Sequence, residues 1–196
     1  MTQKQTTPWG EVGYPTFKRT YSRPLKNGKT EEWTDTVDRV VEACNKQLNC
    51  NFSEREQKDV RNIMLNLKGT VAGRFLWQLG TKTVDKLGLP SLQNCAFTVV
   101  DQPIRPFTWA FEMLMLGSGV GFNIQREHVY QLPKIKRKVK VTRLDENDAD
   151  FIVPDSREGW VDLLYRVLKA SFKTGESFTF ATHLIRGKGS AIKGFG

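Results

Sequence analysis

Cys95 is the residue of this sequence whose type and position most readily suggest chemistry. It follows Gln93-Asn94 and opens an apolar run over residues 95–100, which predicts a buried strand. A cysteine at the start of a strand, beside a glycine-lined cavity, can serve as a redox thiol. Free cysteines are also common as small core residues. The local sequence leaves both interpretations open and favours the core role.

Two glycine-containing turns are candidate anion sites. Residues 117–121, Gly-Ser-Gly-Val-Gly, join an expected helix to an expected strand at about residues 122–124. Glycine lets backbone N–H groups approach an anion closely. The spacing is not GxGxxG, and the loop precedes a strand, so it is not a dinucleotide fingerprint. Tight packing explains it equally well. The turn Thr70 to Arg74 predicts either a phosphate contact or a plain helix end.

Other reactive side chains predict structural roles. Cys44 and Cys50 are six residues apart, which fits no common zinc pattern. His128 and His183 are solitary in the sequence, so neither a metal site nor a catalytic triad is expected. The acidic residues within 144–150 lack the spacing of a calcium loop and predict a solvated loop.

Residues 134–143 carry six positive charges and no negative one. This segment has no aromatic side chains between its charges on which bases could stack. It therefore predicts an exposed strand, hairpin or subunit surface rather than a nucleic-acid interface.

The first part of the chain predicts an extended arm followed by a helical cap. Residues 1–30 contain Pro8, Pro15 and Pro24, which interrupt helices, and several aromatic anchors that should fasten the arm to a folded body. The cap occupies residues 31–94. Its first helix is expected to start at Thr34 or Asp35 and to bury Val37, Val40, Val41 and Cys44. Ser53 and Glu56 predict a capping box for the second, with an apolar stripe of Val60, Ile63, Met64 and Leu67.

Residues 95–196 alternate between strand and helix patterns. A helix is expected from Pro106 to about Leu116, a second one capped by Asp155 or Ser156, and a third strand over residues 177–180. This order predicts an α/β fold. The chain closes on Gly194-Phe195-Gly196, a turn signal with nothing after it, so we expect the fold to be interrupted there.

Composition limits the class of protein. The chain has 196 residues, 39% of them hydrophobic, which is enough for one ordinary domain with a core. A net charge of +9 favours polyanionic partners such as nucleotides or acidic surfaces. Three irregularly spaced cysteines argue against a disulfide framework. No apolar stretch is long enough to span a membrane, and the N-terminus has no signal core, so a cytoplasmic protein without membrane contacts is expected.

Seven segments in order resemble the N-terminal part of an adenosylcobalamin-dependent, class II ribonucleotide reductase, above all the ribonucleoside-triphosphate reductase branch. They are residues 16–23 (TFKRTYSR), 32–41 (EWTDTVDRVV), 73–81 (GRFLWQLGT), 92–97 (LQNCAF), 119–122 (GVGF), 154–160 (PDSREGW), and 185–187 (IRG) with 194–196 (GFG).

The resemblance implies a helical cap and the first part of a ten-stranded α/β barrel over residues 95–196. It implies that Cys95 is one of a redox-active cysteine pair, which reverses the local preference for a core role. It also implies that Asn94, Thr70, Ser118, Gly119, Val120 and Gly121 contact the ribonucleotide substrate. Adenosylcobalamin is the implied cofactor, most of its site lying outside this chain, and a thioredoxin-type protein is the implied reductant.

Two departures from the family pattern stand out. The radical-bearing cysteine and the partner of Cys95 lie further along in the family, so the chain alone is expected to be inactive and to need a C-terminal fragment. The long insert that holds the specificity effector in the triphosphate-reductase branch is also missing, because residues 101–106 and 134–150 are short. The alternative is a stand-alone nucleotide- or nucleic-acid-binding module derived from the reductase.

Overall fold

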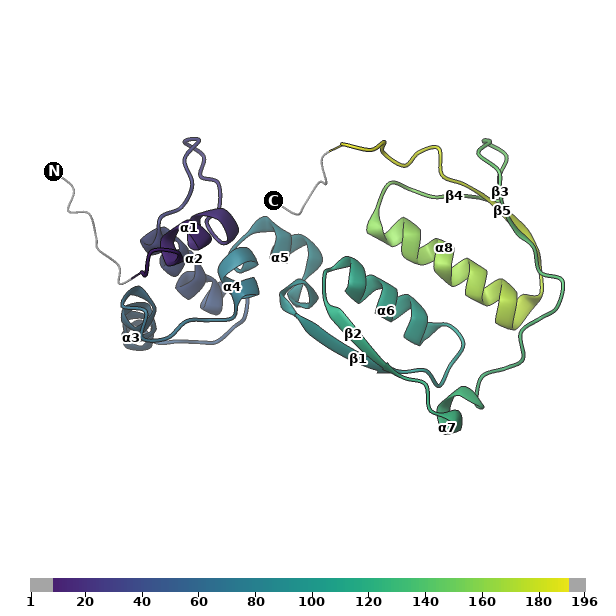
Figure 1. The fold of residues 1–196 in the computed structure, drawn as a ribbon, viewed down its shortest axis with the longest axis horizontal. Helices are drawn as coiled ribbons and strands as arrows, with labels where there is room; N and C mark the ends of the chain where they lie inside the picture. The colour runs from purple at the N-terminus through teal and green to yellow at the C-terminus, as the bar shows by residue number, and fades with distance from the viewer. Residues whose placement is uncertain (1–8, 191–196) are drawn as a thin grey trace. The chain divides into compact units, whose positions relative to one another are not determined.

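The computed structural model describes residues 9–190 and divides the chain into two units. The first unit comprises residues 9–93 and the second residues 94–190 of the described chain (Figure 1). The first eight residues of the predicted arm and the turn at residues 194–196 lie outside the described residues.

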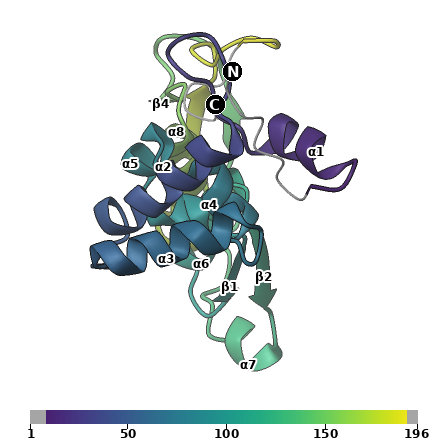
Figure 2. The ribbon, with the colours of Figure 1, turned by 90° about the vertical axis from the view of Figure 1, so that its left-hand side faces the viewer.

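The first unit is helical. Its elements are α1 (Gly13–Thr20), α2 (Trp33–Lys46), α3 (Glu54–Leu65), α4 (Gly73–Gln78), α5 (Lys82–Leu87) and the 3₁₀ turn η1 (Leu89–Leu92). Helices α2 and α3 lie side by side (Figure 2). The predicted stripe on α2 is confirmed: Val37, Val40, Val41 and Cys44 are all buried. The stripe on α3 is only partly confirmed, because Met64 is buried while Ile63 is exposed.

Helix α1 corrects the prediction of an arm that is extended throughout. Pro15 is the third residue of this helix, in the first turn, where backbone N–H groups have no intrahelical partner in any case. The expected anchoring to the body is confirmed. The rings of Trp9 and Phe17 stack at 5.6 Å, and both meet the Trp33 ring edge-on, at 5.2 and 5.4 Å.

Local capping explains where the two long helices of this unit begin. Ser53 and Glu56 form the predicted capping box, in which each accepts a hydrogen bond from the other's backbone N–H. Helix α2 begins earlier than predicted, because Glu32 rather than Thr34 or Asp35 is its N-cap. Asp35 accepts a hydrogen bond from the Glu32 N–H at 2.9 Å and so completes a second capping box.

The second unit is α/β, as predicted. It contains β1 (Cys95–Val99), α6 (Arg105–Met115), β2 (Gly119–Asn123), α7 (Arg126–Val129), β3 (Val141–Arg143), β4 (Phe151–Ile152), α8 (Arg157–Lys169), the π-helical turn η2 (Ala170–Thr174) and β5 (Phe178–Ala181). Strands β1 and β2 pair in parallel, and β3, β5 and β4 form a second parallel sheet in that order. The described strands form these two small sheets, and a ten-stranded barrel is not confirmed.

Strand β1 is present where the sequence predicts it, but it is not buried. Cys95 is exposed and the Phe97 side chain is 64% exposed. Helix α6 packs on β1 and β2. The prediction of burial is wrong because a strand's burial depends on layers from other parts of the fold, and here the apolar pattern faces a side without cover.

The acidic loop ties the second sheet together, which the prediction of a merely solvated loop missed. Asp145 accepts a hydrogen bond from the Thr182 N–H at 2.7 Å, and Asp150 accepts one from the Thr179 N–H at 2.7 Å. The Arg143 side chain and the Thr182 N–H lower the pKa of Asp145 to about 2. Within residues 9–190, no cluster of His, Cys, Asp and Glu could hold a metal ion, and no helix is long and apolar enough to cross a membrane.

Gly159 explains part of the motif at residues 154–160. Ser156 caps α8, as predicted, by accepting a hydrogen bond from the Gly159 N–H at 3.0 Å. A Cβ on Gly159 would lie 2.5 Å from the Pro154 carbonyl oxygen, which is backbone and cannot move aside cheaply. We expect Gly159→Ala to lower the free energy of unfolding by about 1–3 kcal/mol through overpacking, measured by urea unfolding. Gly187→Ala is the matched control, because nothing lies within 4 Å of the added methyl; equal losses in both variants would contradict this account.

Candidate functional site

Cys95 stands at the start of β1, on a face that the second unit leaves open. Side chains alternate along a strand, so Cys95 and Phe97 share one face while Thr98 lies on the other. The parallel register places Gly119 opposite Cys95 and Gly121 opposite Phe97. The two residues of β1 on this face and the two glycines opposite them are all exposed. The thiol therefore lies beside two residues without side chains, on an accessible surface.

The glycines at residues 119 and 121 place no side chains on this face of the strand pair. The nearest atom to a Cβ built on Gly119 is the Asn94 carbonyl oxygen, at 3.8 Å, so the space above this residue is open. A Cβ on Gly121 would come within 3.1 Å of the Phe97 ring, which lies over it. The glycines thus leave room for a ligand to approach the backbone next to Cys95.

The predicted glycine loop is shorter than expected, because β2 already begins at Gly119. Gly117 has φ +85° and follows the last residue of the α6 C-terminus. Its N–H donates to Leu114 O at 2.8 Å, and the Ser118 N–H donates to Met113 O at 2.9 Å. These two bonds form a Schellman motif that ends the helix. Ser118 is buried, and its N–H belongs to the helix end rather than to an open loop.

The backbone of β2 is divided between its partner strand and a free edge. The Gly119 N–H donates to Asn94 O at 2.8 Å and the Val100 N–H donates to Asn123 O at 3.0 Å. By the alternation of a parallel ladder, Val120 and Phe122 direct their backbone groups to the outer edge of β2, and Cys95 directs its own to the outer edge of β1. Among the described strands, neither edge carries a third strand.

The remaining predicted site residues fall into two groups. Asn94 is exposed, directly before Cys95, and its carbonyl oxygen is bound by Gly119. Thr70 is exposed in the loop before α4 of the first unit. The structure thus brings Asn94, Cys95, Gly119, Val120 and Gly121 together, with Ser118 directly beneath. Thr70 belongs to the first unit, whereas the other predicted site residues belong to the second.

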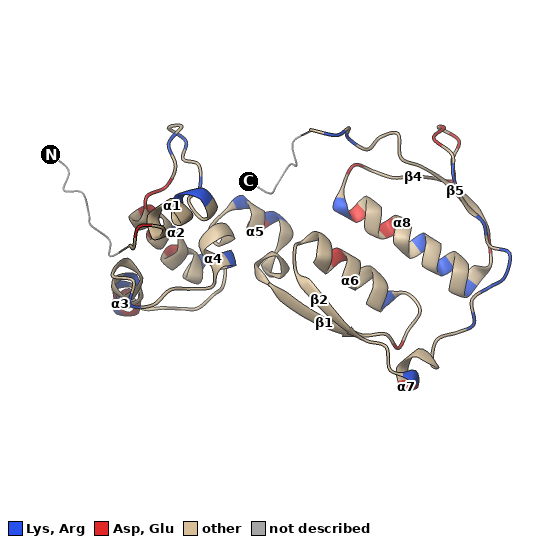
Figure 3. Cartoon of the chain, viewed as in Figure 1, with Lys and Arg blue, Asp and Glu red and all other residues tan. Residues whose placement is uncertain are grey.

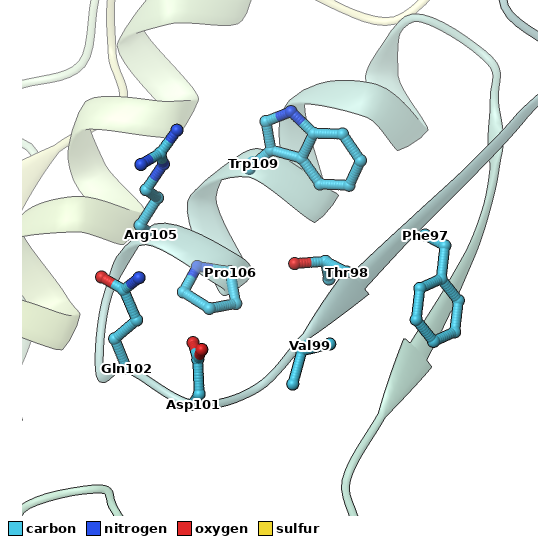
Figure 4. A pocket seen from close by; sticks show the side chains of 8 residues that line it. All are labelled: Phe97, Thr98, Val99, Asp101, Gln102, Arg105, Pro106 and Trp109. Atoms are coloured by element: carbon cyan, nitrogen blue, oxygen red, sulfur yellow. The ribbon is translucent and has the colours of Figure 1, made fainter. Parts of the chain in front are cut away.

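A hollow of about 280 Å³ lies at the other end of β1, away from the thiol. Its lining includes Asp101, Gln102, Arg105 and Trp109, from the turn after β1 and the first turns of α6 (Figure 4). In the same view Thr98 points to the side of α6. Cys95 does not line this hollow, but Phe97, which shares the face of Cys95, does.

Positive charge gathers on another part of the second unit. The six basic side chains of residues 134–143 are exposed, as predicted, and only Val141–Arg143 form a strand. Basic side chains also occupy the last turns of α8 (Figure 3). The backbone of Lys136 is fixed by a hydrogen bond from its N–H to Ser171 O at 2.7 Å.

Sequence reasoning missed one pair of reactive side chains. Cys44, at the end of α2, and Cys50, in the loop after it, lie together in the structure. Their six-residue spacing fits no zinc motif, but the two asparagines that flank Cys50 could have signalled a sharp turn back to the helix.

Comparison with known proteins now adds to this geometry. The family model of the ribonucleotide reductase alpha domain matches residues 1–81. The adenosylcobalamin-dependent ribonucleoside-triphosphate reductase of Lactobacillus gasseri is 30% identical over 259 aligned positions, which cover 100% of this chain and 35% of that protein. The enzyme of the same name from Euglena gracilis is 32% identical, and the match covers 94% of this chain and 27% of the relative.

A solved structure agrees with these relatives. The crystal structure of a B12-dependent, class II ribonucleotide reductase superposes with a TM-score of 0.78 at 28% identity, covering 97% of this chain and 35% of the other. The chain thus spans about a third of the length of the relatives that it matches. The Lactobacillus gasseri alignment is longer than this chain of 196 residues, so that relative carries extra residues within the matched region. In sequence and in fold, the chain corresponds to the N-terminal third of an adenosylcobalamin-dependent, class II ribonucleotide reductase.

Proposed function

We propose that the chain supplies the substrate-facing N-terminal part of a cobalamin-dependent reductase that converts ribonucleoside triphosphates to deoxyribonucleotides. The observation that carries this proposal is the position of Cys95, exposed at the start of β1 and paired in register with Gly119. A buried thiol could serve packing alone, whereas this one is open to a ligand. The names of the relatives supply the reaction class.

In this function Cys95 is one of two thiols that provide the reducing electrons. The two thiols are oxidised to a disulfide and give up two electrons and two protons. The ribose C2′–O bond breaks, the oxygen leaves as water, and hydrogen takes its place at C2′. A thioredoxin-type dithiol then reduces the disulfide, so that the next turnover can begin. The second cysteine belongs to the remainder of the protein.

The open face beside Cys95 is the proposed ribonucleotide contact. Asn94 lies next to the thiol, and Gly119, Val120 and Gly121 present backbone to the same region. Ser118 supports this backbone from its buried position. Thr70 would contact the substrate from the first unit.

Adenosylcobalamin does not find a complete site in the described residues. The hollows at α6 and along α8 have volumes of about 280 and 530 Å³, which is in the range for a ligand of nucleotide size. The bound cofactor would supply the radical that starts the reaction, and most of its contacts would come from the remainder of the protein. The chain's own contribution is the thiol and the substrate-facing backbone.

The uncovered surfaces of the second unit fit a C-terminal partner segment. Both outer edges of the β1–β2 pair are free, and Phe97, Phe122 and Ile124 are 60% or more exposed. A two-stranded sheet has little stability of its own. Further parallel strands would satisfy these edges and cover the apolar side chains.

The proposal is tested by reconstitution. The tagged chain is produced together with the protein segment that completes it, and the purified complex receives adenosylcobalamin, a dithiol and ribonucleoside triphosphates, or diphosphates in a parallel assay. We expect cobalamin-dependent deoxyribonucleotide formation from the complex and none from either segment alone. A stable complex that binds cobalamin and yet forms no deoxyribonucleotide would contradict the proposal.

Gly119→Ala separates substrate contact from folding. The added methyl has no neighbour closer than 3.8 Å, so the free energy of unfolding should change by less than about 1 kcal/mol. On the face beside Cys95, however, the methyl occupies space needed by the substrate. We expect kcat/KM of the complex to fall about tenfold or more. Gly10→Ala, with nothing within 4 Å of its methyl, is the control, and unchanged kcat/KM in Gly119→Ala would remove this face from the substrate site.

The exposed basic residues of the 134–143 segment favour a second candidate function, a nucleic-acid-binding module. Such binding by the isolated chain would weaken steeply with salt and would depend on these side chains. Binding of single-stranded DNA that survives physiological salt and is lost on replacing Lys136, Arg137 and Lys138 by alanine would support this module. Weak binding that disappears at moderate salt would reject it.

A further inference from the structure

Cys44 and Cys50 form a pair of neighbouring thiols in the first unit, which does not contain Cys95. Cys44 lies near the end of α2 with its side chain buried. Cys50 lies in the loop between α2 and α3, and it is exposed. The two residues are joined by a backbone hydrogen bond, from the Cys50 N–H to the Cys44 carbonyl oxygen. One member of the pair is thus open to reagents in solution and the other is sheltered behind it.

The backbone holds the two residues at a distance that a disulfide can bridge. The Cys50 N–H donates to the Cys44 carbonyl oxygen at 3.0 Å. A carbonyl oxygen lies about 2.4 Å from its own Cα, and an amide nitrogen about 1.5 Å from its own. The two Cα atoms are therefore at most about 6.9 Å apart, which is within the limit of about 7 Å for a disulfide.

The loop is shaped to return Cys50 to the helix. Asn49 and Asn51 have φ values of +54° and +56°, in the left-handed region that asparagine tolerates better than most residues. The Asn45 side chain fixes Phe52, the residue after Asn51. Its Oδ1 accepts a hydrogen bond from the Phe52 N–H and its Nδ2 donates one to Phe52 O, both at 2.8 Å. The loop therefore already holds the backbones of the two cysteines next to one another before any oxidation.

We propose that Cys44 and Cys50 are a redox-sensitive dithiol site that low-molecular-weight disulfides, such as oxidised glutathione, convert reversibly to an intramolecular disulfide. Cys50, the accessible thiol, attacks the glutathione disulfide first, which forms a mixed disulfide and releases one glutathione. The Cys44 thiol then attacks Cys50 Sγ and releases the second glutathione. Two protein thiols are oxidised, one glutathione disulfide is reduced to two thiols, and each protein thiol proton ends on a released glutathione.

The order of attack follows from burial and charge. Burial raises the pKa of the Cys44 thiol, and the neighbouring Cys50 thiol raises it further, so Cys44 remains protonated while Cys50 is accessible. Cys44 therefore reacts second, when the mixed disulfide is held next to it. Reduction by a dithiol returns the pair, because the resulting bond closes only a short loop near the surface.

The test uses the full chain with Cys95 replaced by serine, so that only the two thiols of the site remain. The chain is incubated with oxidised glutathione, quenched with acid, treated with iodoacetamide and analysed by intact mass and peptide mapping. We expect a species that has lost two hydrogens, takes up no iodoacetamide, and yields a peptide pair joined through Cys44 and Cys50. Dithiothreitol should restore two alkylation sites.

Two variants make the order of events visible. Cys44→Ala should stop at a stable glutathione adduct on Cys50, and Cys50→Ser should lose at least nine tenths of the reaction of the buried Cys44. A persistent glutathione adduct in the parent chain, or disulfides only between chains, would overturn the proposal. Because the peptide map of the parent chain decides the matter, a variant that fails to fold does not obscure it. The test requires no reductase activity and is independent of the proposed function.

Discussion

Cys95→Ser in the assembled reductase is expected to abolish multiple turnover with a dithiol reductant. Serine keeps the size and exposure of the side chain, but its hydroxyl cannot form a disulfide, so the two reducing electrons are not delivered. Because Cys95 is exposed on β1, the exchange leaves no cavity and should change the free energy of unfolding by less than about 0.5 kcal/mol. Steady-state deoxyribonucleotide formation, measured by chromatography, should fall to background.

Cys50→Ser provides the matched control, since it also replaces an exposed cysteine by serine. It should retain wild-type turnover under reducing conditions. Loss of activity in both variants would point to general damage. Unchanged steady-state turnover in Cys95→Ser would refute the redox role.

The second large effect is expected at a buried ion pair that holds the first unit together. Glu31 is 4% exposed, and its two carboxylate oxygens accept hydrogen bonds from Arg39 Nε and Nη2 at 2.7 and 2.9 Å. Arg39 also donates to the carbonyl oxygens of Leu76 and Leu79, at the C-terminal end of α4. Thr36 Oγ1 donates to the same carboxylate at 2.7 Å. A single guanidinium therefore joins α2, the segment before it and α4.

Arg39→Ala should lower the free energy of unfolding by about 3–5 kcal/mol, because it leaves a buried carboxylate without its cationic partner and removes the guanidinium donor from two helix-end carbonyls. Arg39→Lys should recover only part of this loss, since an ammonium cannot form the bidentate pair. Arg61→Ala removes an arginine from a surface pair with Asp38, both side chains being 39% or more exposed, and should cost less than about 1 kcal/mol. Urea unfolding of the three variants decides the matter, and similar losses in Arg39→Ala and Arg61→Ala would contradict this role.

The same network sets a pH dependence. Burial raises the pKa of Glu31, but the hydrogen bonds from Arg39 and Thr36 outweigh it, so the pKa lies below its ordinary value of 4.5. A carboxylate with a lowered folded-state pKa contributes its stability in full above the unfolded-state pKa and loses it as the pH falls. Unfolding midpoints should therefore fall more steeply below about pH 4.5 in the wild type than in Glu31→Gln. If the two proteins showed the same pH dependence of the unfolding midpoint, Glu31 would not be the group responsible.

How far the sequence predicts the fold depends on the range of the interactions involved. Helices α3 and α8 are predictable because a serine directly before each of them, Ser53 or Ser156, caps its first turn. The helix in the N-terminal arm is harder to predict. Proline interrupts a helix interior but is compatible with a first turn, and Pro15 lies in the first turn of α1. Capping and proline geometry are local effects, so they shift the predicted bounds of a helix by only a few residues.

The candidate site shows the opposite case. Residues alone could not decide whether Cys95 was buried, because the cover of β1 comes from distant parts of the chain. The glycines at 119 and 121 have the local pattern of loop residues, yet the hydrogen bond from the Gly119 N–H to Asn94 O begins the pairing that makes them part of a strand. The proximity of Cys44 and Cys50 is also invisible in the local pattern, because it depends on two asparagines with left-handed backbone that turn the loop back toward the helix. Pairing and proximity of this kind do not appear in a local pattern.

If Cys95 supplies reducing electrons, it is oxidised during turnover. The most direct measurement is a single turnover of the assembled enzyme without external reductant, quenched in acid, alkylated and mapped by mass spectrometry. We expect a disulfide between Cys95 and a cysteine outside this chain, formed in a one-to-one ratio with deoxyribonucleotide. Deoxyribonucleotide formed while Cys95 remains fully alkylatable would contradict it.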